Sequence, residues 1–586
     1  MAEDNREKSV IADNMRIDWD LPITMDDGIV LRADVYRPVK EGKHPVILTY
    51  GPYAKGLPFE VGYKDQYENM TGNFPEIKAG TTNKYQCWEV VDPEKWVSEG
   101  YAIVRVDSRG AGRSPGYLDT YSPREAKDIH DCVEWAAVQP WSNGKVGMLG
   151  ISYYAQNQWQ VSTKHQPPHL AAMCAWEGAA DFYRDTYRHG GIKCDWYEGW
   201  YRRQVVTVQH GVGERGAVDP NSGMLVAGPE TLTVEELARN REEIGDPILA
   251  HPLDDQYYRD RSPDWSKLTV PLLSTANWGG QGLHARGNFE GFVRAASKQK
   301  WLEVHGIEHW THFYTDYGVN IQKQFFAHFL KGEKNGWDKR PKVQLQVRHP
   351  EEKFVERFEN EWPMARTKWT KFYLHPNGHW LGAEPPKQPV KVEFEAMGKG
   401  VEFISAPLEK ETEITGPLAA KLFVSSSTTD ADIFLVFKVY TPDLREVVFL
   451  GAIDPHTPVA QGWLRASHRK LDPKLTKPYR PYHTHDELQP LKPGVPVELD
   501  VEIWPTSIVV PAGYRIALSV RGKDYEFADK TGIKLPHFKN ELKGCGPFLH
   551  NDPRDRPAKI FAGKTTLHID PEHAPYVLLP VIPPKK

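Results

Sequence analysis

Cysteine is scarce in this chain. Only 5 of its 586 residues are cysteine, and they are scattered, odd in number and without a CxxC pair. This pattern argues against a disulfide framework and against a structural zinc site, and favours buried free thiols in a reducing compartment. The five residues are Cys87, Cys132, Cys174, Cys194 and Cys545.

The chain also lacks a strong charge imbalance and any long apolar run. Its net charge is −5, from 73 basic and 78 acidic residues, which predicts no basic face for nucleic acid or anionic lipid. No stretch approaches the roughly 20 apolar residues that span a bilayer. The N-terminal Met1–Val10 is charged and has no apolar h-region, so no signal peptide is expected. We therefore expect a cytoplasmic protein without a membrane or nucleic-acid partner, and leave homo-oligomerisation open.

The first part of the chain alternates strand and helix patterns. Pro45–Tyr50, Tyr101–Val106 and Ala171–Trp176 are short apolar runs of the kind that lie buried in parallel sheets. Between them, Arg124–Val138 places apolar residues on one helical stripe. This order predicts a doubly wound α/β domain.

A chain of this length exceeds one hydrophobic core, and the patterns divide it into domains. Residues 1–180 form the first part of the α/β core, and residues 181–262, which lack strand-like runs, form a helical cap. Strand signals return at Val270–Thr275 and Lys300–Val304, so 263–340 is assigned to the second part of the core. From 341 to 586, strands separated by Pro, Gly and Asp turns predict a β-sandwich.

The segment Lys145–Ala155, KVGMLGISYYA, has a strand that leads directly into Gly150-Ile151-Ser152. A sharp strand-to-helix turn that exposes a serine is the nucleophile elbow of serine hydrolases. The usual GxSxG motif has a second glycine where this chain has Tyr154. By itself the motif is weak, because a serine that caps a helix has the same appearance.

The sequence around this motif resembles a known family. Gln139–Met148 reads QPWSNGKVGM, Asp107–Gly110 reads DSRG, and Trp504–Ser519 reads WPTSIVVPAGYRIALS. In these segments, and in the same order along nearly its whole length, the chain resembles the cocaine esterase / X-prolyl dipeptidyl-peptidase (CocE/NonD) family. The resemblance implies an α/β-hydrolase core with an inserted helical cap, a C-terminal jelly roll, and Ser152 as the nucleophile.

A serine nucleophile needs a general base. His309 lies in a loop just past the last predicted strand of the core, where this fold carries its catalytic histidine, and the family's histidine loop aligns there without a gap. His305 and His312 are rivals. His305–His309 also reads H-x-x-E-H, but Gly306 and the nearby strand end do not suit two zinc ligands on one helix face, so no metal is predicted.

The acid of the triad is missing from its expected place. In family relatives an aspartate follows the strand before the histidine loop, and here Gly280 occupies that position. The α/β-hydrolase fold offers another place, at the end of the strand that follows the elbow, where this chain has Glu177. We therefore predict Glu177 as the displaced acid, with Glu308 and Asn277 as weaker alternatives.

The resemblance also implies an oxyanion hole, built from the hydroxyl of Tyr53 and the backbone N–H of Tyr153. Two such donors stabilise the developing negative charge of the transition state. For the substrate pocket, we expect aromatic walls from residues of the cap and of the loop after the predicted strand at Val270–Thr275. The expected wall residues are Trp196, Trp200 and Trp278, with Tyr197 and Tyr201 as further cap aromatics.

These observations predict a serine hydrolase that cleaves a carboxylic ester through an acyl-enzyme and needs no cofactor. Relatives that act on α-amino acid esters hold an ammonium group with extra carboxylates, and Gly279–His284 supplies none. An apolar or aromatic acyl group is therefore favoured. Two alternatives stay open: an amidase or X-Pro-type peptidase, and a non-catalytic binding protein with a decayed triad.

Overall fold

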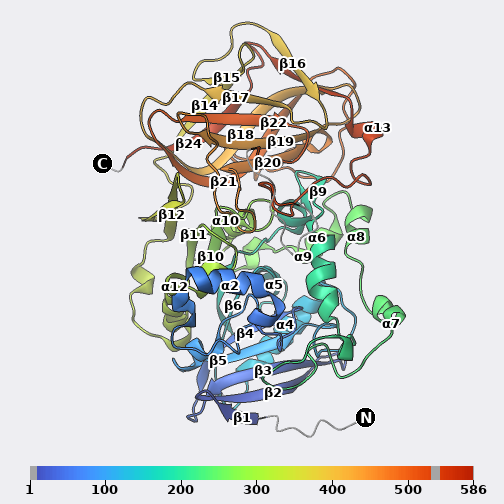
Figure 1. Ribbon diagram of the computed structural model, residues 1–586, viewed down its shortest axis with the longest axis vertical. Helices are drawn as coiled ribbons and strands as arrows, with labels where there is room; N and C mark the ends of the chain where they lie inside the picture. The colour runs from blue at the N-terminus through green and yellow to red at the C-terminus, as the bar shows by residue number, and fades with distance from the viewer. Residues whose placement is uncertain (1–8, 529–540, 585–586) are drawn as a thin grey trace.

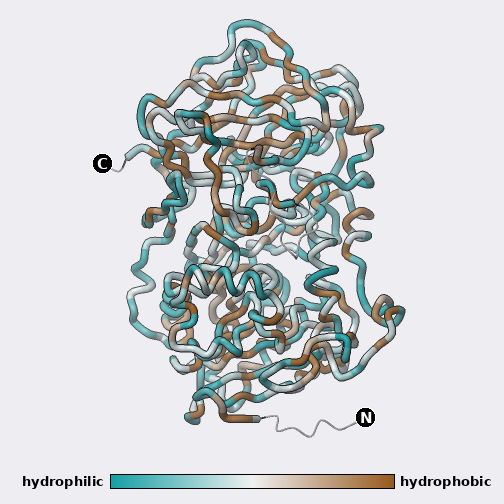
Figure 2. Tube along the Cα trace, in the orientation of Figure 1, coloured by the Kyte–Doolittle hydropathy of each residue, from teal (hydrophilic) through white to brown (hydrophobic). Residues whose placement is uncertain are grey.

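The computed structural model describes residues 9–528 and 541–584, so residues 1–8 of the charged N-terminal stretch lie outside the described part. An α/β unit and a β-domain are stacked along the long axis of the molecule, and the segment 177–271 packs along their side (Figure 1). Figure 2 shows hydrophobic segments within both units. In the described ranges, no helix combines the length and the apolar character that crossing a bilayer requires.

The first sheet has eleven strands, and its centre is parallel. Its strands, in spatial order, are β1 (Ser9–Ala12), β2 (Met15–Thr24), β3 (Val30–Pro38), β5 (Ala102–Asp107), β4 (His44–Gly51), β6 (Ser142–Ile151), β7 (Leu170–Trp176), β10 (Leu272–Asn277), β11 (Lys300–His305), β12 (Val343–His349) and β13 (Lys353–Glu359). From β5 to β12 each neighbouring pair is parallel. These strands are buried on both faces, which explains their continuous apolar runs.

Helices connect the parallel strands and cover the sheet. The predicted helix at 124–138 is α4 (Pro123–Ala137), and the hydroxyl of Ser122 caps it by accepting the N–H of Glu125. Its stripe, with Ile129 and Cys132, packs against β4 and β6 in one core cluster. The other helices of this unit are α1 (Phe59–Gly62), α2 (Lys64–Asn73), α3 (Pro93–Val97), α5 (Tyr153–Lys164), α10 (Ala285–Arg294), α11 (Thr311–Tyr314) and α12 (Asp316–Phe326).

The segment between β7 and β10 contains short helices and one small hairpin. The hairpin pairs β8 (Arg188–His189) with β9 (Ile192–Lys193). The α-helices of this segment are α6 (Trp196–Trp200), α7 (Val234–Arg239), α8 (Gly245–Ala250) and α9 (Gln256–Arg261). The expected helix over 234–244 ends early, because Asn240 leaves the helical conformation and its N–H closes the last turn.

The C-terminal unit is a β-domain whose strand pairing closes on itself. Its strands are β14 (Lys368–His375), β15 (Trp380–Gly382), β16 (Val390–Glu395), β17 (Val401–Ser405), β18 (Thr412–Ser426), β19 (Asp432–Tyr440), β20 (Ala460–Arg465), β21 (Val497–Val510), β22 (Arg515–Arg521), β23 (Lys564–Ile569) and β24 (Tyr576–Ile582); the short helix α13 (Ala558–Phe561) precedes β23. The order runs from β18 through β21, β20, β19, β22, β17, β15 and β14 to β24, which pairs again with β18. This ring does not establish the expected jelly roll, which stays a prediction.

The expected boundary at residue 341 differs from the structure. Strands β12 and β13 lie after it, yet both belong to the first sheet rather than to the β-domain. The reason is that β12 pairs in parallel with β11 through Leu302–Val304, and β13 folds back on β12 as a hairpin. Apolar periodicity identifies a strand but not the sheet that it joins.

Candidate active site

The candidate site lies at the carboxyl ends of the parallel strands. Tyr53 follows β4, Ser152 follows β6, Glu177 follows β7 and His309 lies beyond the end of β11. In open α/β sheets this edge is where ligands bind. The topology thus brings side chains that are far apart in the sequence to one edge of the sheet.

Ser152 occupies a strained turn between β6 and α5. Its φ of 55° and ψ of −109° lie outside the usual regions for a residue with a side chain. Glycine is needed nearby, because a Cβ on Gly150 or on Gly51 would lie 2.4 Å from the side chain of Tyr154. These two glycines make room for Tyr154, which explains how the elbow forms without the usual second glycine.

Glu177 contacts His309 through its carboxylate. Nδ1 of His309 lies 2.8 Å from Oε2 of Glu177, and both side chains are buried. Oε1 of Glu177 lies 2.8 Å from Nε2 of His305 and accepts a hydrogen bond of 3.2 Å from Asn277. Glu308, the other alternative, points away and accepts from the side chain of Asn69.

His309 has a second carboxylate partner, Glu89, which the sequence did not reveal. Oε1 of Glu89 lies 2.9 Å from Nε2 of His309, and Glu89 is 2% exposed. The backbone of Glu89 is also tied to the elbow, because its carbonyl accepts the N–H of Ile151. Its sequence context, QCWEVV, follows no motif, so only the fold brings it to the site.

His284 is a second residue that sequence reasoning missed. Its Nε2 lies 3.0 Å from Oγ of Ser152, and its Nδ1 lies 3.1 Å from the backbone nitrogen of Ala179. A backbone N–H can only donate, so Nδ1 accepts and the proton of a neutral imidazole is on Nε2. His284 therefore donates to Ser152, and the ring of His309 stacks beside it with centroids 5.2 Å apart.

The buried charges shift the protonation of the imidazoles in opposite directions. Burial lowers the pKa of His309, but the carboxylates of Glu177 and Glu89 outweigh it and raise that pKa to about 9. Burial and the neighbouring His309 hold the pKa of His284 well below its ordinary value. Burial raises the pKa of Glu177, yet the charge of His309 and the hydrogen bonds from both histidines lower it to about 2. His309 thus carries the charge and His284 stays neutral.

Two hydrogen-bond donors flank the serine. The hydroxyl of Tyr53 accepts a hydrogen bond of 3.0 Å from Nε1 of Trp200, which leaves its own proton available to a ligand. Burial raises the pKa of Tyr53 well above its ordinary value, so this hydroxyl stays protonated. Tyr153 is the first residue of α5, where a backbone N–H has no partner within the helix. Both donors therefore suit a negatively charged oxygen.

A pocket with aromatic walls opens over Ser152. Trp196 and Trp200 of the cap line it together with Tyr197, whereas Tyr201 is not among its lining residues. The remaining lining residues are Tyr53, Gln66, Trp88, Glu89, Tyr121, Ser152, Gln156, Gln204, Leu283, His309, Trp310 and Ile453.

The expectation for Trp278 was wrong. Its side chain is fully buried, packs against Phe289 and Trp362, and donates to the carbonyl of Gln346. Trp278 directly follows Asn277, whose side chain faces Glu177, and alternation along an extended segment turns the next side chain the other way.

The rival histidines are His305 and His312. His305 lies between Glu177 and Glu303, at 2.8 and 2.7 Å. Nδ1 of His312 faces the hydroxyl of Thr315. His305 and His309, the two histidines of the H-x-x-E-H stretch, therefore both contact Glu177.

Comparison with known proteins identifies the family of this chain. Residues 27–314 match the family model described as X-Pro dipeptidyl-peptidase (S15 family), and residues 335–578 match the X-Pro dipeptidyl-peptidase C-terminal non-catalytic domain. A CocE/NonD family hydrolase from Staphylococcus aureus superposes with a TM-score of 0.82 at 30% identity, over 97% of this chain and 94% of that chain. The chain belongs to the CocE/NonD family. Its homologues are hydrolases and esterases, as the resemblance implied.

More distant proteins match over nearly the whole chain. Cocaine esterase from Rhodococcus sp. is 23% identical over 97% of this chain and 99% of its own length. An aminopeptidase from the marine sediment archaeon Thaumarchaeota archaeon superposes with a TM-score of 0.68 at 16% identity, over 100% of this chain and 99% of that chain, which shows the fold alone. In this CocE/NonD chain, Gly280 stands where the family resemblance places the acid, and its N–H donates to the carbonyl of Asn277.

Proposed function

We propose that this CocE/NonD protein cleaves a carboxylic ester through an acyl-enzyme on Ser152. The observation that carries the proposal is the strained turn of Ser152. The turn presents the hydroxyl to Nε2 of His284, and Ser152 lines a pocket with aromatic walls. The pair formed by His309 and Glu177 lies beside it and supplies the acid–base group. Ser152, His309 and Glu177 then act as nucleophile, base and orienting acid.

In the acylation step, Oγ of Ser152 attacks the ester carbonyl and forms the new C–O bond. Nε2 of His309, turned from Glu89 towards the serine, accepts the hydroxyl proton, while Glu177 stabilises the imidazolium through Nδ1. The Tyr53 hydroxyl and the Tyr153 N–H stabilise the negative oxygen of the tetrahedral intermediate. His309 then donates its proton to the alkoxy oxygen, and the alcohol leaves.

Deacylation repeats these steps with water. His309 accepts a proton from the water as its oxygen bonds to the acyl carbon, and the bond between that carbon and Oγ breaks. Oγ of Ser152 recovers its proton from His309, and the carboxylic acid leaves. In this scheme His284 holds the serine oxygen by donation from Nε2 and does not exchange protons.

The pocket walls support an apolar or aromatic acyl group. Trp88, Trp196 and Trp200 offer flat apolar surfaces around Ser152. The carboxylate of Glu89 also lines this pocket and contacts His309 through Oε1. The substrate class that fits this lining is the ester of an aromatic or branched-chain carboxylic acid with a simple alcohol.

The test begins with intact-protein mass after reaction with a fluorophosphonate, on wild type and Ser152→Ala. We expect a single adduct on wild type only, and turnover lost by about 10⁴-fold or more in the variant. Matched ester and anilide pairs, with benzoyl, acetyl and Xaa-Pro acyl groups, then give the ratio of kcat/KM for each bond type.

Each outcome assigns a function. Benzoyl esters that react faster than acetyl esters and anilides support the proposal. Faster cleavage of the anilides would replace it with an amidase or X-Pro-type peptidase. A folded wild type that forms no adduct and turns over none of the substrates would favour the binding-protein alternative.

A further inference from the structure

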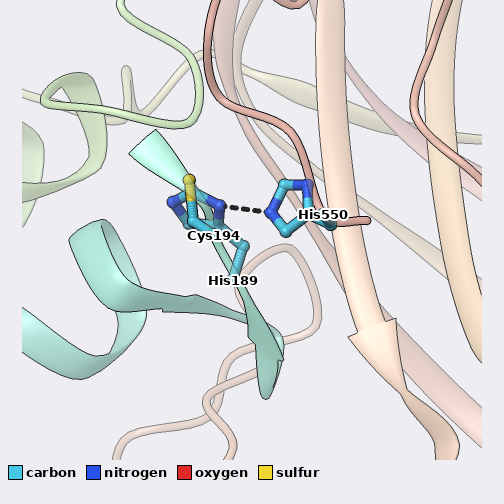
Figure 3. Close-up of side chains that lie close together, drawn as sticks. All are labelled: His189, Cys194 and His550. Atoms are coloured by element: carbon cyan, nitrogen blue, oxygen red, sulfur yellow. Dashed lines mark hydrogen bonds between the residues drawn. The ribbon is translucent and has the colours of Figure 1, made fainter. Parts of the chain in front are cut away.

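A cluster of two histidines and one cysteine lies between the cap hairpin and the β-domain. His189 ends β8, Cys194 directly follows β9, and His550 comes from a loop of the C-terminal unit (Figure 3). All three side chains are buried, and one ligand atom from each lies within 4.8 Å of the other two. The cluster does not line the pocket over Ser152, so it belongs to a different part of the molecule.

The two imidazoles face each other with unshared electron pairs. Nδ1 of His189 lies 2.7 Å from Nε2 of His550. The other nitrogen of His189 lies 2.9 Å from the carbonyl oxygen of Asp185, and the other nitrogen of His550 lies 2.7 Å from Oδ1 of Asp524. Both outer partners can only accept, so each outer nitrogen carries a proton, and in the neutral rings each inner nitrogen presents a lone pair.

This orientation is the one that metal-binding histidines have. Such histidines donate their second N–H to a carboxylate or a backbone carbonyl, which points the bare nitrogen at the metal. Two facing lone pairs need a cation between them.

Cys194 adds a third donor of matching chemistry. A thiolate with two imidazoles is a ligand set that zinc accepts, with a Zn–S distance of about 2.3 Å and Zn–N distances of about 2.0–2.1 Å. Binding of the ion displaces the thiol proton of Cys194 to solvent. Trp463 and Trp504 pack on His189, with ring centroids 4.9 and 5.5 Å away, and provide an apolar shell.

We propose that His189, Cys194 and His550 bind one Zn²⁺ ion that joins the cap hairpin to the C-terminal β-domain. Tetrahedral geometry sets two nitrogen ligands about 3.3 Å apart, so the two rings separate by several tenths of an ångström when the ion binds. The fourth ligand is a water molecule.

Ion pairs already bring the two units together around this site. Arg188 pairs with Asp555 at 2.7 Å, and Lys193 pairs with Asp552 at 3.0 Å. The zinc ion therefore adds to an existing contact rather than creating one. Since Trp196 lies two residues beyond Cys194 and lines the active-site pocket, the ion also anchors one pocket wall.

The rival arrangement is a single proton shared between the two imidazoles, with Asp524 balancing its charge. It satisfies the same 2.7 Å contact but gives Cys194 no role. Metal content and cysteine ligation therefore separate the two arrangements.

The test uses the full-length, untagged protein, dialysed against Zn²⁺ and passed through a desalting column. Elemental analysis should find about one zinc per chain in wild type and in Cys545→Ser, which removes a buried thiol outside the cluster. In Cys194→Ser the retained zinc should fall roughly tenfold or more. Wild type without zinc, or Cys194→Ser with a full equivalent, would overturn the proposal.

A second measurement uses only the wild-type protein, so its result does not depend on whether a variant folds. Co²⁺ in place of Zn²⁺ should give wild type a thiolate-to-cobalt charge-transfer band in the near ultraviolet, together with the visible bands of tetrahedral cobalt. Cobalt bound without the charge-transfer band would mean that Cys194 is not a ligand. No bound cobalt and no zinc would establish the shared proton.

Discussion

Nε2 of His284 donates to Oγ of Ser152 over 3.0 Å, while Nδ1 of the same ring accepts the N–H of Ala179. The imidazole nearest to the serine is thus held in the wrong tautomer for a base, because the nitrogen that faces the hydroxyl already carries a proton. It also lacks a carboxylate on its second nitrogen, which a triad histidine needs. The neighbouring ring of His309 has one, and our proposal therefore assigns the base to His309.

His284→Leu tests this division of roles. Removing the donor should lower kcat by about 10²–10³-fold, the usual cost of losing one donor to a reacting oxygen. The acid limb of the pH profile should stay where it is, because burial already keeps the pKa of His284 below the range of activity. His284→Gln, which keeps an N–H, should recover part of the loss. Disappearance of the acid limb in His284→Leu would instead make His284 the base.

Glu177→Gln tests the displaced acid. The change keeps the shape of the side chain but removes the charge that stabilises the His309 imidazolium, and we expect kcat to fall by about 10³–10⁴-fold. Glu308→Gln is the matched control, since Glu308 lies in the same loop as His309 and contacts Asn69 instead. It should keep nearly all activity. Undiminished turnover by a folded Glu177→Gln protein would remove Glu177 from the triad.

The sequence predicted those parts of the fold in which the pattern of a single strand or helix is enough to identify it. The buried runs that became β4, β5 and β7 are apolar throughout because both faces of a parallel strand are covered. The allocation of β12 to the first sheet could not be predicted, because it depends on pairing with β11, a contact between strands.

The residues of the candidate site also divide into those that the sequence predicted and those that it did not. Ser152 and His309 carry local motifs and a family resemblance, and Glu177 follows from the fold's known alternative position for the acid. His284 and Glu89 could not be found, because each is a single residue without a motif whose partners lie 132 and 220 positions away in the chain. Trp278 was misplaced because the direction of its side chain depends on the exact end of β10.

Glu89 makes a prediction about pH. Activity needs neutral His309, so kcat/KM rises with pH through the pKa of that residue, which the two carboxylates raise to about 9. Glu89→Gln removes one of these carboxylates, so the pKa of His309 falls and the acid limb should move to lower pH by about 1–3 units. The variant should therefore be most active, relative to wild type, below neutral pH.

The control for this profile is Glu89→Asp, which keeps the negative charge and should leave the acid limb close to that of wild type. Profiles of kcat/KM measured over the full range of stability, with one ester substrate, decide the question. An acid limb that does not move in Glu89→Gln would show that Glu89 does not set the protonation of His309.

Tyr53→Phe tests the oxyanion hole. The hydroxyl of Tyr53 accepts from Trp200, and its own proton is the one left for the substrate oxygen. Because the charge on that oxygen develops only in the transition state, the loss should appear in kcat, by about 10²–10³-fold, with little change in KM. Tyr197→Phe is the matched control, because Tyr197 is another buried tyrosine that lines the pocket. Equal losses in both variants would mean that the tyrosines shape the pocket rather than stabilise the oxyanion, and a loss confined to KM in Tyr53→Phe would assign its hydroxyl to substrate binding.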